Sequence, residues 1–552
     1  MSSFNIELKD GRNILVKEGT MLNDIIKENN LLYDLPVVLG KLDNKFYELA
    51  TTISQDGKFE AIDITTRIGM MTYVRTLQFV LIKAISELFP KAKISIEHSL
   101  SKGLFGEIHK TLALDIDDIY DIKNRMGEII RADIPIRRIA FSKEKAVEIF
   151  MEYDMQDKVK LLKYVSAEEI KLYELDGRYD YFYGPMAYST GVLKTFDLIY
   201  YEPGFILRYP TSDSPNKIPK FYKHEKLAKV FYEAAQWGEI LGVGSVGALN
   251  DEVVSGDIVE LIRVAEALHE KKIAYIADMI HRRGNVKLVL IAGPSSSGKT
   301  TFSRRLGIQL RVNGLIPIFV SLDDYFLNRE ITPRDENGEY DFESIYALDL
   351  ELFNKDLELL LKGEETEIPS FNFKTGKREW HGNKIKMPKN GVMIVEGIHG
   401  LNEILTSSIS KDSKFKIYIS PLTQLNLDDH NRISTTDVRM TRRIVRDYLS
   451  RGYGVEDTLK MWPSIKRGEE KNIFVFQEQA DAMFNSSSVY ELCVLKKFAL
   501  AELNKIGEES PVYFQASRLR SFLNFFKDVD KELVPDNSII REFTGGSCFY
   551  QY

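Results

Sequence analysis

The feature that most constrains the fold of this chain is the run GPSSSGKT at residues 293–300. It fits the phosphate-loop pattern G-x-x-x-x-G-K-[ST] at every fixed position. Residues 286–292 form an apolar run typical of a buried strand, and residues 301–312 can form a helix. A strand, a glycine-rich turn and a helix place backbone N–H groups where they bind a phosphate. The pattern therefore predicts a nucleoside-triphosphate site on an α/β sheet.

The last residues of this loop have roles that follow from their chemistry. The Lys299 ammonium can bridge the β- and γ-phosphates, and the Thr300 hydroxyl can hold Mg²⁺. A chance turn rich in glycine and serine is the alternative, but it does not account for the flanking strand and helix. We therefore expect ATP and Mg²⁺ as cofactors, with the nucleotide bound by Gly293, Ser295, Ser296, Ser297, Gly298, Lys299, Thr300 and Thr301.

Two further apolar runs end in carboxylates. Residues 318–322 lead into Asp323 and Asp324, and residues 392–395 lead into Glu396. Because neighbouring parallel strands end at one edge of a sheet, we expect these acids beside the γ-phosphate. An aspartate there can accept a proton from an acceptor hydroxyl, and the glutamate can hold Mg²⁺. Helix capping or a buried structural role are the alternatives, and the sequence leaves open which aspartate faces the site.

Four arginines follow at helical spacing. They recur at i, i+3, i+4 and i+7, so they share one face of a helix. Guanidinium groups on one stripe repel one another unless an anion neutralises them, and a transferring phosphoryl group is such an anion. The alternative is a solvated face neutralised by two nearby aspartates, Asp437 and Asp447. The arginines are Arg439, Arg442, Arg443 and Arg446.

Composition excludes several classes of protein. The chain has 552 residues, 44% hydrophobic and 28% charged, which is ordinary globular usage and enough for three or four domains. A net charge of -7 gives no general attraction to nucleic acid or to an anionic membrane. Two cysteines, Cys493 and Cys548, cannot form a disulfide framework or a Cys-x-x-Cys zinc site. No signal peptide and no run of 18 apolar residues is evident, so we expect a cytoplasmic protein without a membrane segment.

Outside the phosphate-loop region, periodicity and turn residues suggest the domain organisation. Residues 1–62 alternate like a small β-grasp sheet, and residues 73–89 form an amphipathic helix that Pro90 ends. Residues 208–220 contain three prolines and read as a linker. A G-x-G-x-x-G match at residues 242–247 follows a helical pattern, so we interpret it as a helix break. We expect an α/β kinase-type domain preceded by a β-grasp module and an α+β module, divided as 1–62, 63–207, 208–285, 286–485 and 486–552.

Residues 286–485 resemble the uridine kinase and phosphoribulokinase group of P-loop kinases. The matching pieces, in the order and spacing of that group, are residues 293–300, 321–326, 369–373 with Arg378, 395–398, 437–447 and 480–481. The resemblance implies transfer of the ATP γ-phosphate to a sugar hydroxyl. It places Asp323 at the catalytic base, Arg439 at the acceptor, and Arg442 and Arg446 on phosphates. The acceptor-binding positions it suggests are Asp324, Tyr325, Glu343, Phe371, Asn372 and Arg439.

The acceptor positions depart from the uridine kinase pattern. Uridine kinases carry a Tyr-Asp-Phe run followed by a histidine that reads the pyrimidine. This chain has Phe371, Asn372 and Phe373 there, with Gly376 at the histidine position. The missing hydrogen-bonding groups would dominate selectivity for a uracil edge. A nucleoside such as uridine or cytidine is therefore the default acceptor, and another sugar or small alcohol is the alternative.

The N-terminal half resembles parts of threonyl-tRNA synthetase. Residues 1–62 resemble its TGS module, and residues 63–205 resemble its second additional, editing domain. In that domain two histidines, a cysteine and a further histidine form a metal-like cluster. The corresponding residues here are Arg75, Phe79, Phe182 and Met186, so we expect packing at these positions and no zinc site.

The sequence thus supports an ATP-dependent kinase acting on a small-molecule acceptor. The alternative from a different class is an ATP-sensing regulatory or RNA-binding protein, in which the synthetase-like half contacts RNA. A homo-oligomer is compatible with either hypothesis. The chain end, residues 536–552, is rich in glycine and apolar residues, and we expect it to dock against the kinase domain.

Overall fold

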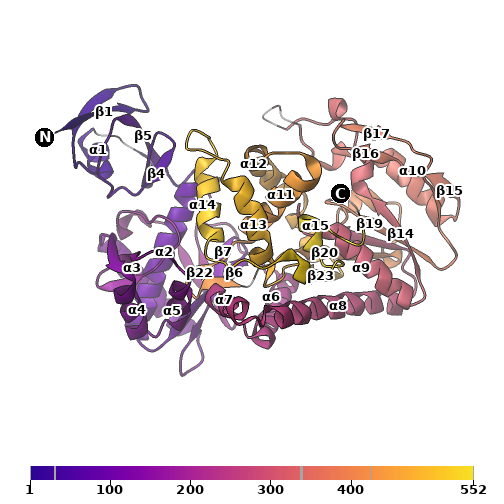
Figure 1. Ribbon diagram of the computed structural model, residues 1–552, viewed down its shortest axis with the longest axis horizontal. Helices are drawn as coiled ribbons and strands as arrows, with labels where there is room; N and C mark the ends of the chain where they lie inside the picture. The colour runs from indigo at the N-terminus through magenta and orange to yellow at the C-terminus, as the bar shows by residue number, and fades with distance from the viewer. Residues whose placement is uncertain are drawn as a thin grey trace.

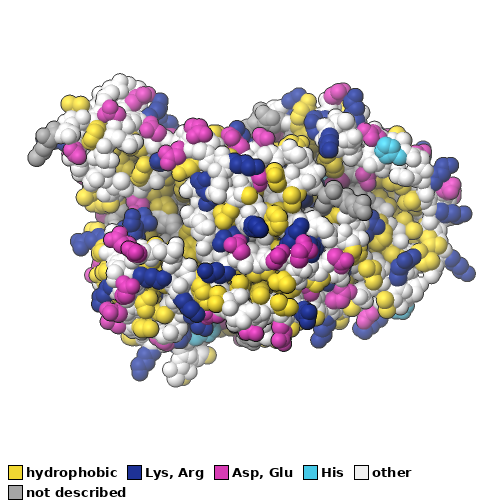
Figure 2. All heavy atoms as spheres, viewed as in Figure 1, with side chains coloured by type: hydrophobic (Ala, Val, Ile, Leu, Met, Phe, Trp, Pro, Cys, Tyr) yellow, Lys and Arg dark blue, Asp and Glu magenta, His cyan; other side chains and the backbone are white. Residues whose placement is uncertain are grey.

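The computed structural model describes residues 2–550 except 30, 32, 336, 337, 339 and 424. Figure 1 shows a small N-terminal sheet projecting from one end of the molecule and a larger sheet with its helices at the other. Figure 2 shows basic and acidic side chains mixed over the visible face, as the modest net charge implies.

The first module is a five-stranded β-grasp sheet with the order β2-β1-β5-β3-β4. Strands β1 and β5 lie parallel at its centre, and Ile6, Leu22, Ile25 and Phe59 fill the core between sheet and helix. The sequence analysis did not identify β5. The elements are β1 (Ser3–Leu8), β2 (Asn13–Lys17), α1 (Leu22–Glu28), β3 (Val37–Leu42), β4 (Lys45–Tyr47) and β5 (Gly57–Asp63).

The second module packs two antiparallel sheets around one long helix, α2 (Arg67–Leu88). The helix begins six residues before the predicted start because Thr66 caps it, accepting a hydrogen bond from the N–H of Gly69 at 3.1 Å. The remaining elements are β6 (Lys93–Leu100), β7 (Gly103–His109), α3 (Ile116–Arg131), β8 (Arg137–Ser142), α4 (Lys143–Glu152), α5 (Gln156–Lys163), β9 (Glu169–Leu175), β10 (Arg178–Asp180), β11 (Asp197–Tyr201) and β12 (Gly204–Arg208).

Helix α2 is also the one described helix that is long and apolar enough to cross a membrane by length and composition. Of its most apolar window, 83% is buried inside the fold. That burial is typical of the core helix of a globular domain.

Three helices connect this module to the next. They are α6 (Glu225–Leu241), α7 (Val246–Ser255) and α8 (Ile258–Arg283), the last running along the edge of the molecule in Figure 1. The glycine-rich segment interrupts the helix between α6 and α7, as predicted. Gly242 there has a φ of 68°. A Cβ on Gly247 would lie 2.8 Å from the backbone N of Leu161, so this glycine permits close packing against α5.

The third module is a parallel sheet with the order β14-β19-β13-β20-β23. All residues of its central strand β13 are buried, since helices cover both faces. The strands are β13 (Leu288–Ala292), β14 (Ile316–Ser321), β19 (Gly391–Glu396), β20 (Lys414–Ser420) and β23 (Ala482–Asn485). The helices are α9 (Lys299–Val312), α10 (Leu350–Leu361), α11 (Thr435–Arg446), α12 (Val455–Asn472), α13 (Glu491–Leu503), α14 (Tyr513–Leu523) and α15 (Arg541–Thr544).

Three short hairpins decorate this sheet. They are β15 (Glu365–Glu367) with β18 (Lys384–Lys386), β16 (Ser370–Asn372) with β17 (Lys377–Glu379), and β21 (Asn426–Asp428) with β22 (Asn431–Arg432). The last hairpin reaches into the synthetase-like module. There Lys158 lies 2.7 Å from Asp428 and 3.1 Å from Asp180, and all three side chains are almost fully buried. This charge cluster ties the two halves of the chain together.

Candidate active site

The candidate site lies where three parallel strands end. In the sheet register, Glu396 at the end of β19 pairs with Ile291 of β13 and with Ser321 of β14. The phosphate loop leaves β13 two residues beyond Ile291, so the predicted strand-end acids and the loop meet at one edge. A pocket of about 430 Å³ opens there, lined by Ser296, Ser297, Gly298, Lys299, Thr300, Asp323, Phe371, Asn372, Phe373, Lys374, Glu396, Arg446, Ser450, Arg451 and Glu542.

The phosphate loop has the backbone geometry that its glycines predict. A Cβ on Gly293 would lie 2.0 Å from the carbonyl oxygen of Ile419, so only glycine fits. Gly298 has a φ of 84° and directly precedes α9. The Lys299 ammonium donates to the carbonyl oxygens of Gly293 at 3.1 Å and Pro294 at 3.3 Å. The ammonium is thus held over the loop. A bound phosphate would replace the two carbonyl oxygens as its hydrogen-bond acceptor.

The oxygen ligands predicted for Mg²⁺ lie together. The Thr300 hydroxyl and the Ser321 hydroxyl each donate to Glu396 Oε1 at 3.3 Å. Hydroxyl and carboxylate oxygens are the ligands that Mg²⁺ prefers. The described residues hold no group of three or more His, Cys, Asp or Glu side chains placed to bind a metal. A small number of protein ligands is typical of a Mg²⁺ site, because the ion keeps waters and substrate phosphates in its coordination shell.

Burial raises the pKa of Glu396 to about 7, and the nearby carboxylates of Asp323 and Glu542 add to the shift. A carboxyl group whose folded pKa lies above its unfolded value destabilises the fold once pH exceeds the unfolded pKa. We therefore expect Glu396→Gln to melt at a higher temperature than the unmodified protein at pH 8.5. At pH 5.5 the difference should be smaller, because the folded carboxyl is then mostly protonated and only the part of the destabilisation just above the unfolded pKa is present. Thermal unfolding in EDTA measures this, and an equal difference at both pH values would contradict it.

The two adjacent aspartates face different surroundings. Asp323 lines the pocket with Lys299 and Thr300. Asp324 Oδ1 instead accepts a hydrogen bond from the N–H of Phe371 at 3.1 Å, and burial raises its pKa to about 6. Asp324 thus holds strand β16 against the site. Of the pair, the geometry favours Asp323 for contact with a reacting hydroxyl.

The other predicted acceptor residues divide in the same way. Phe371 and Asn372 line the pocket from β16. The Tyr325 hydroxyl donates to Asp356 at 3.0 Å, and its ring is buried in the core beneath the site, away from the pocket lining. Among the residues that the structure describes, Glu343 Oε2 is buried without a hydrogen-bond partner, and burial raises the pKa of this carboxyl to about 8. At neutral pH this group is therefore mostly protonated and can donate a hydrogen bond.

The four arginines lie on one face of α11, but they contact different partners. Arg439 forms an ion pair with Glu469. Arg442 is fully buried, with Glu491 at 2.6 Å. Arg442 also donates to the carbonyl oxygen of Ser486 at 2.8 Å, so it supports the loop from behind. Arg446, paired with an aspartate at 3.1 Å, is the one of the four that lines the pocket. Acceptor binding by Arg439 and a phosphate contact by Arg442 stay predictions.

A fifth arginine that the sequence analysis missed lines the pocket. Helix α11 passes into a π-helical turn, η7 (Asp447–Arg451). A π-turn holds one more residue than an α-turn, so it shifts the helical register by one. Arg451 lines the pocket together with Ser450, the residue that the spacing of the stripe alone would place there. Arg446 and burial lower the pKa of the Arg451 guanidinium to about 10.

The C-terminal segment docks against the phosphate loop, as expected from the sequence. Glu542 Oε2 accepts hydrogen bonds from the backbone N–H of Thr301 at 3.1 Å and from its hydroxyl at 2.9 Å. The Tyr550 hydroxyl lies 2.5 Å from the same hydroxyl. Thr301 is in the first turn of α9, whose N–H groups attract anions. A carboxylate of the chain itself therefore occupies a position predicted for the nucleotide.

We expect Glu542→Gln to bind ATP about tenfold more tightly, because the substitution removes a negative charge next to the phosphate site while keeping an accepting oxygen. Titration calorimetry with ATP measures the change. Glu532→Gln, at an exposed carboxylate just before this segment, is the matched control and should bind ATP unchanged. Weaker ATP binding by Glu542→Gln would instead make the glutamate part of the nucleotide site.

The residues at the synthetase-type ligand positions pack together. The rings of Phe79 and Phe182 lie 5.1 Å apart between centroids, and both are buried with Met186. Arg75 donates to the carbonyl oxygen of Pro185 at 2.7 Å. These contacts agree with the predicted packing role.

Comparison with known proteins gives different relatives for the two halves. Residues 288–492 match the model of the phosphoribulokinase / uridine kinase family. Threonine–tRNA ligase of Caldanaerobacter subterraneus subsp. tengcongensis is 29% identical over 195 residues, which is 35% of this chain and 30% of that enzyme. The enzyme of Pelobacter propionicus is 27% identical over 199 residues, 36% of this chain and 31% of its own length. The chain thus spans less than a third of these ligases.

Among solved structures, a possible uridine kinase from Bacillus stearothermophilus is 20% identical, with a TM-score of 0.23. The match covers 27% of this chain and 79% of that one. The family match and the ligase matches agree with the two resemblances that the motifs predicted. Residues 288–492 match the phosphoribulokinase / uridine kinase family, and the N-terminal half of the chain is similar to part of threonine–tRNA ligases.

Proposed function

We propose that this protein is an ATP-dependent kinase that transfers the γ-phosphoryl group to a hydroxyl of a small molecule, with a nucleoside 5′-hydroxyl as the leading acceptor. One observation carries the proposal. Asp323, Lys299 and Thr300 line a single pocket at the end of the phosphate loop, with Glu396 beside them. That set contains a proton acceptor, a cation for the phosphates and oxygen ligands for a metal.

The reaction follows from these positions. The acceptor oxygen attacks the γ-phosphorus, and the bond from that phosphorus to the β–γ bridging oxygen breaks, so that ADP leaves. Asp323 takes the proton of the attacking hydroxyl. Lys299, Arg446 and Arg451 offset the negative charge on the phosphoryl oxygens. Mg²⁺, when bound, would neutralise charge on the phosphates, with Thr300 and Glu396 as the protein groups that hold it.

The acceptor would lie against the hairpin that carries Phe371 and Asn372. The Phe371 and Phe373 rings lie 5.2 Å apart at 73° and form an apolar wall beside the pocket. Gly376 has a φ of 69°, and a Cβ there would lie 2.9 Å from the Arg329 side chain. The position that carries a base-reading histidine in uridine kinases is thus closed to a side chain here. The wall favours a flat or apolar acceptor surface, and it supports a nucleoside without selecting uracil.

ADP release by the full chain with ATP and Mg²⁺ tests the proposal, against a panel of nucleosides, sugars, sugar phosphates and amino acids. Lys299→Ala is the control and should release no ADP with any acceptor. Stimulation by uridine or cytidine would support the nucleoside acceptor, and stimulation by another alcohol would replace it. ATP binding without stimulation by any compound would contradict the kinase and favour the ATP-sensing alternative, with RNA binding by residues 1–205 as the next test.

A further inference from the structure

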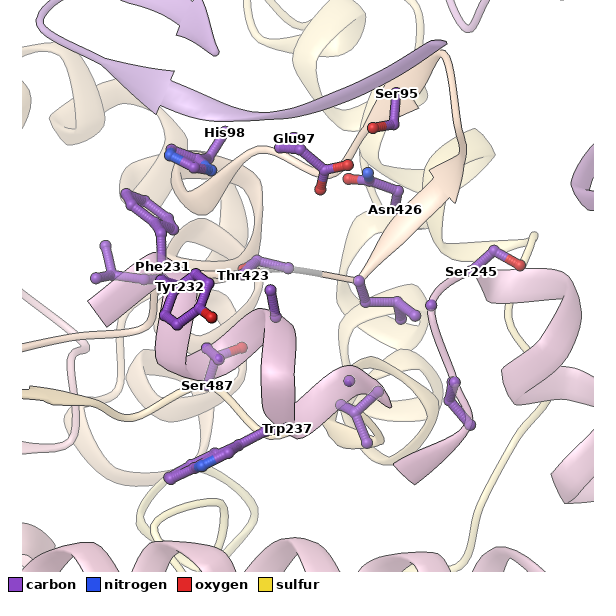
Figure 3. Close-up of a pocket in the computed structure, with 18 of the residues that line it drawn as sticks. Ser95, Glu97, His98, Phe231, Tyr232, Trp237, Ser245, Thr423, Asn426 and Ser487 are labelled. Atoms are coloured by element: carbon purple, nitrogen blue, oxygen red, sulfur yellow. The ribbon is translucent and has the colours of Figure 1, made fainter. Parts of the chain in front are cut away.

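A second cavity, of about 1190 Å³, lies between the synthetase-like half and the parallel sheet. Its walls are helix α6, strand β6 and the loops that follow β20 and β23, as Figure 3 shows in part. Pockets for small molecules typically have volumes of roughly 300–1,000 Å³. This cavity is therefore large enough for such a ligand, and none of the catalytic groups lines it.

Aromatic side chains form one wall of this cavity. The His98 ring stacks on the Phe231 ring at 3.6 Å between centroids and 11° between planes. Burial lowers the pKa of His98 to about 3, so this ring is neutral at physiological pH. Tyr232 of α6 lies beside this pair in Figure 3, and Trp237 lies farther along the same helix and also lines the cavity. Such a wall favours a planar ligand that stacks.

Buried polar side chains also line the cavity. Thr423, Ser488 and His269 are 8%, 4% and 2% exposed and line the cavity. Within the described part of the chain, Thr423 Oγ1, Ser488 Oγ and His269 Nδ1 have no hydrogen-bond partner. Leaving such atoms unsatisfied costs free energy that a polar ligand would recover. These three atoms therefore point to a ligand with its own hydrogen-bonding groups.

The charged side chains around the cavity indicate the charge of the ligand. Six carboxylates and four lysines line it. Lys93 and Lys223 pair with carboxylates outside the cavity at 2.8 and 2.9 Å, and Glu491 pairs with Arg442 at 2.6 Å, so carboxylates still outnumber lysines among the remaining residues. Glu97 projects toward Ser95 and Asn426 in Figure 3. Burial raises the pKa of the Glu107 carboxyl, and the negative charge of Glu97 raises it further. An excess of carboxylates attracts a cation and repels phosphates.

We propose that this cavity binds an aromatic amine, with the ring against Tyr232 and Trp237 and the ammonium group toward Glu97. The aromatic wall accounts for the ring, and a cation beside aromatic faces is further stabilised by their quadrupoles. The carboxylates account for the charge. The buried hydroxyls and the His269 nitrogen supply hydrogen bonds that fix orientation. The inference does not depend on the kinase reaction, since it uses other residues.

Calorimetric titration of the full chain with tryptamine tests the proposal, and indole-3-acetate is the matched probe with the same ring and the opposite charge. One tryptamine should bind per chain, at least about tenfold more tightly than indole-3-acetate. Absence of tryptamine binding, or equal binding of the two probes, would overturn the proposal. Substitutions in this cavity should leave the affinity for ATP unchanged. Titration of the same variants with ATP therefore tests the amine site separately from the kinase proposal.

Two variants locate the bound amine. Glu97→Gln should weaken tryptamine binding about tenfold, because it removes the facing charge and keeps the shape. Thr423→Val should also weaken binding, while the melting temperature of the free protein stays equal or rises, since the substitution removes a buried unsatisfied hydroxyl. Glu148→Gln, at an exposed carboxylate of α4 that does not line the cavity, is the control and should bind tryptamine unchanged. Tryptamine binding by Glu97→Gln at the level of the unmodified protein would refute the assigned site.

Discussion

Asp323→Asn is expected to lower kcat by about 100- to 10,000-fold while ATP binding stays unchanged. The asparagine keeps the size of the side chain but cannot accept a proton at pH 7. Asp323 lines the phosphate-loop pocket with Lys299 and Thr300, so its loss affects the chemical step rather than the nucleotide. ADP release at saturating ATP, together with calorimetric titration of ATP, measures the two quantities separately.

The neighbouring residue provides the matched control. Asp324→Asn keeps an oxygen that can accept the hydrogen bond from Phe371, so the hairpin should stay in place and kcat should fall less than tenfold. A larger loss for Asp324→Asn than for Asp323→Asn would reverse the assignment of the base. Loss of ATP binding by Asp323→Asn would show that this carboxylate positions the nucleotide instead.

Lys158→Met is expected to lower the free energy of unfolding by about 3–5 kcal/mol. The substitution retains the apolar stem of the side chain but leaves Asp180 and Asp428 buried without their shared cation. His430 Nδ1 lies 2.7 Å from Asp180 and can neutralise only part of that charge. Urea-induced unfolding followed by circular dichroism measures the change.

Lys163→Met is the control for this effect. Lys163 lies on the same helix and pairs with Asp251 at 2.7 Å, but its side chain is 62% exposed. Exposed ion pairs contribute little because water and salt screen them, so the unfolding midpoint should hardly move. Equal unfolding curves for the two variants would mean that the buried cluster does not hold the halves together.

If Lys158→Met loosens the contact between the halves, it should also alter the shape of the cavity beneath α6 and so weaken binding of tryptamine there. Asp157, next to Lys158, accepts a hydrogen bond from the N–H of Asp429 at 2.7 Å and lines that cavity. In the synthetase-like half, Phe79, Phe182 and Met186 pack together. Residues of this half and of the parallel-sheet module together line the cavity in which the proposed ligand would bind.

Much of the kinase module follows from local sequence. The phosphate-loop pattern requires a strand before it and a helix after it, because only that geometry brings backbone N–H groups to one point. The strand-end positions of Asp323 and Glu396 follow from the same topology, since parallel strands end at one edge. The β-grasp order could be anticipated in outline from alternating residues, although β5 was not identified because its run of alternation is short.

The roles of the arginines required the tertiary structure. Their shared face follows from helical spacing, but Arg442 turns inward to Glu491 while Arg446 reaches the pocket. Arg451 enters through a π-turn, which no periodicity in the sequence marks. The partners of Arg439 and Arg442 are Glu469 and Glu491, which lie 30 and 49 residues away in the chain, and local patterns carry no information on such distant contacts.

The sequence by itself predicted the nucleotide site, because that site depends on a short contiguous motif whose spacing sets the backbone geometry. Only the tertiary structure decided which aspartate faces the pocket, how Glu542 meets Thr301, and where the two halves enclose a cavity. Each of these depends on packing between residues far apart in the chain. Such packing is set by the burial of whole surfaces against one another, which no local sequence pattern specifies.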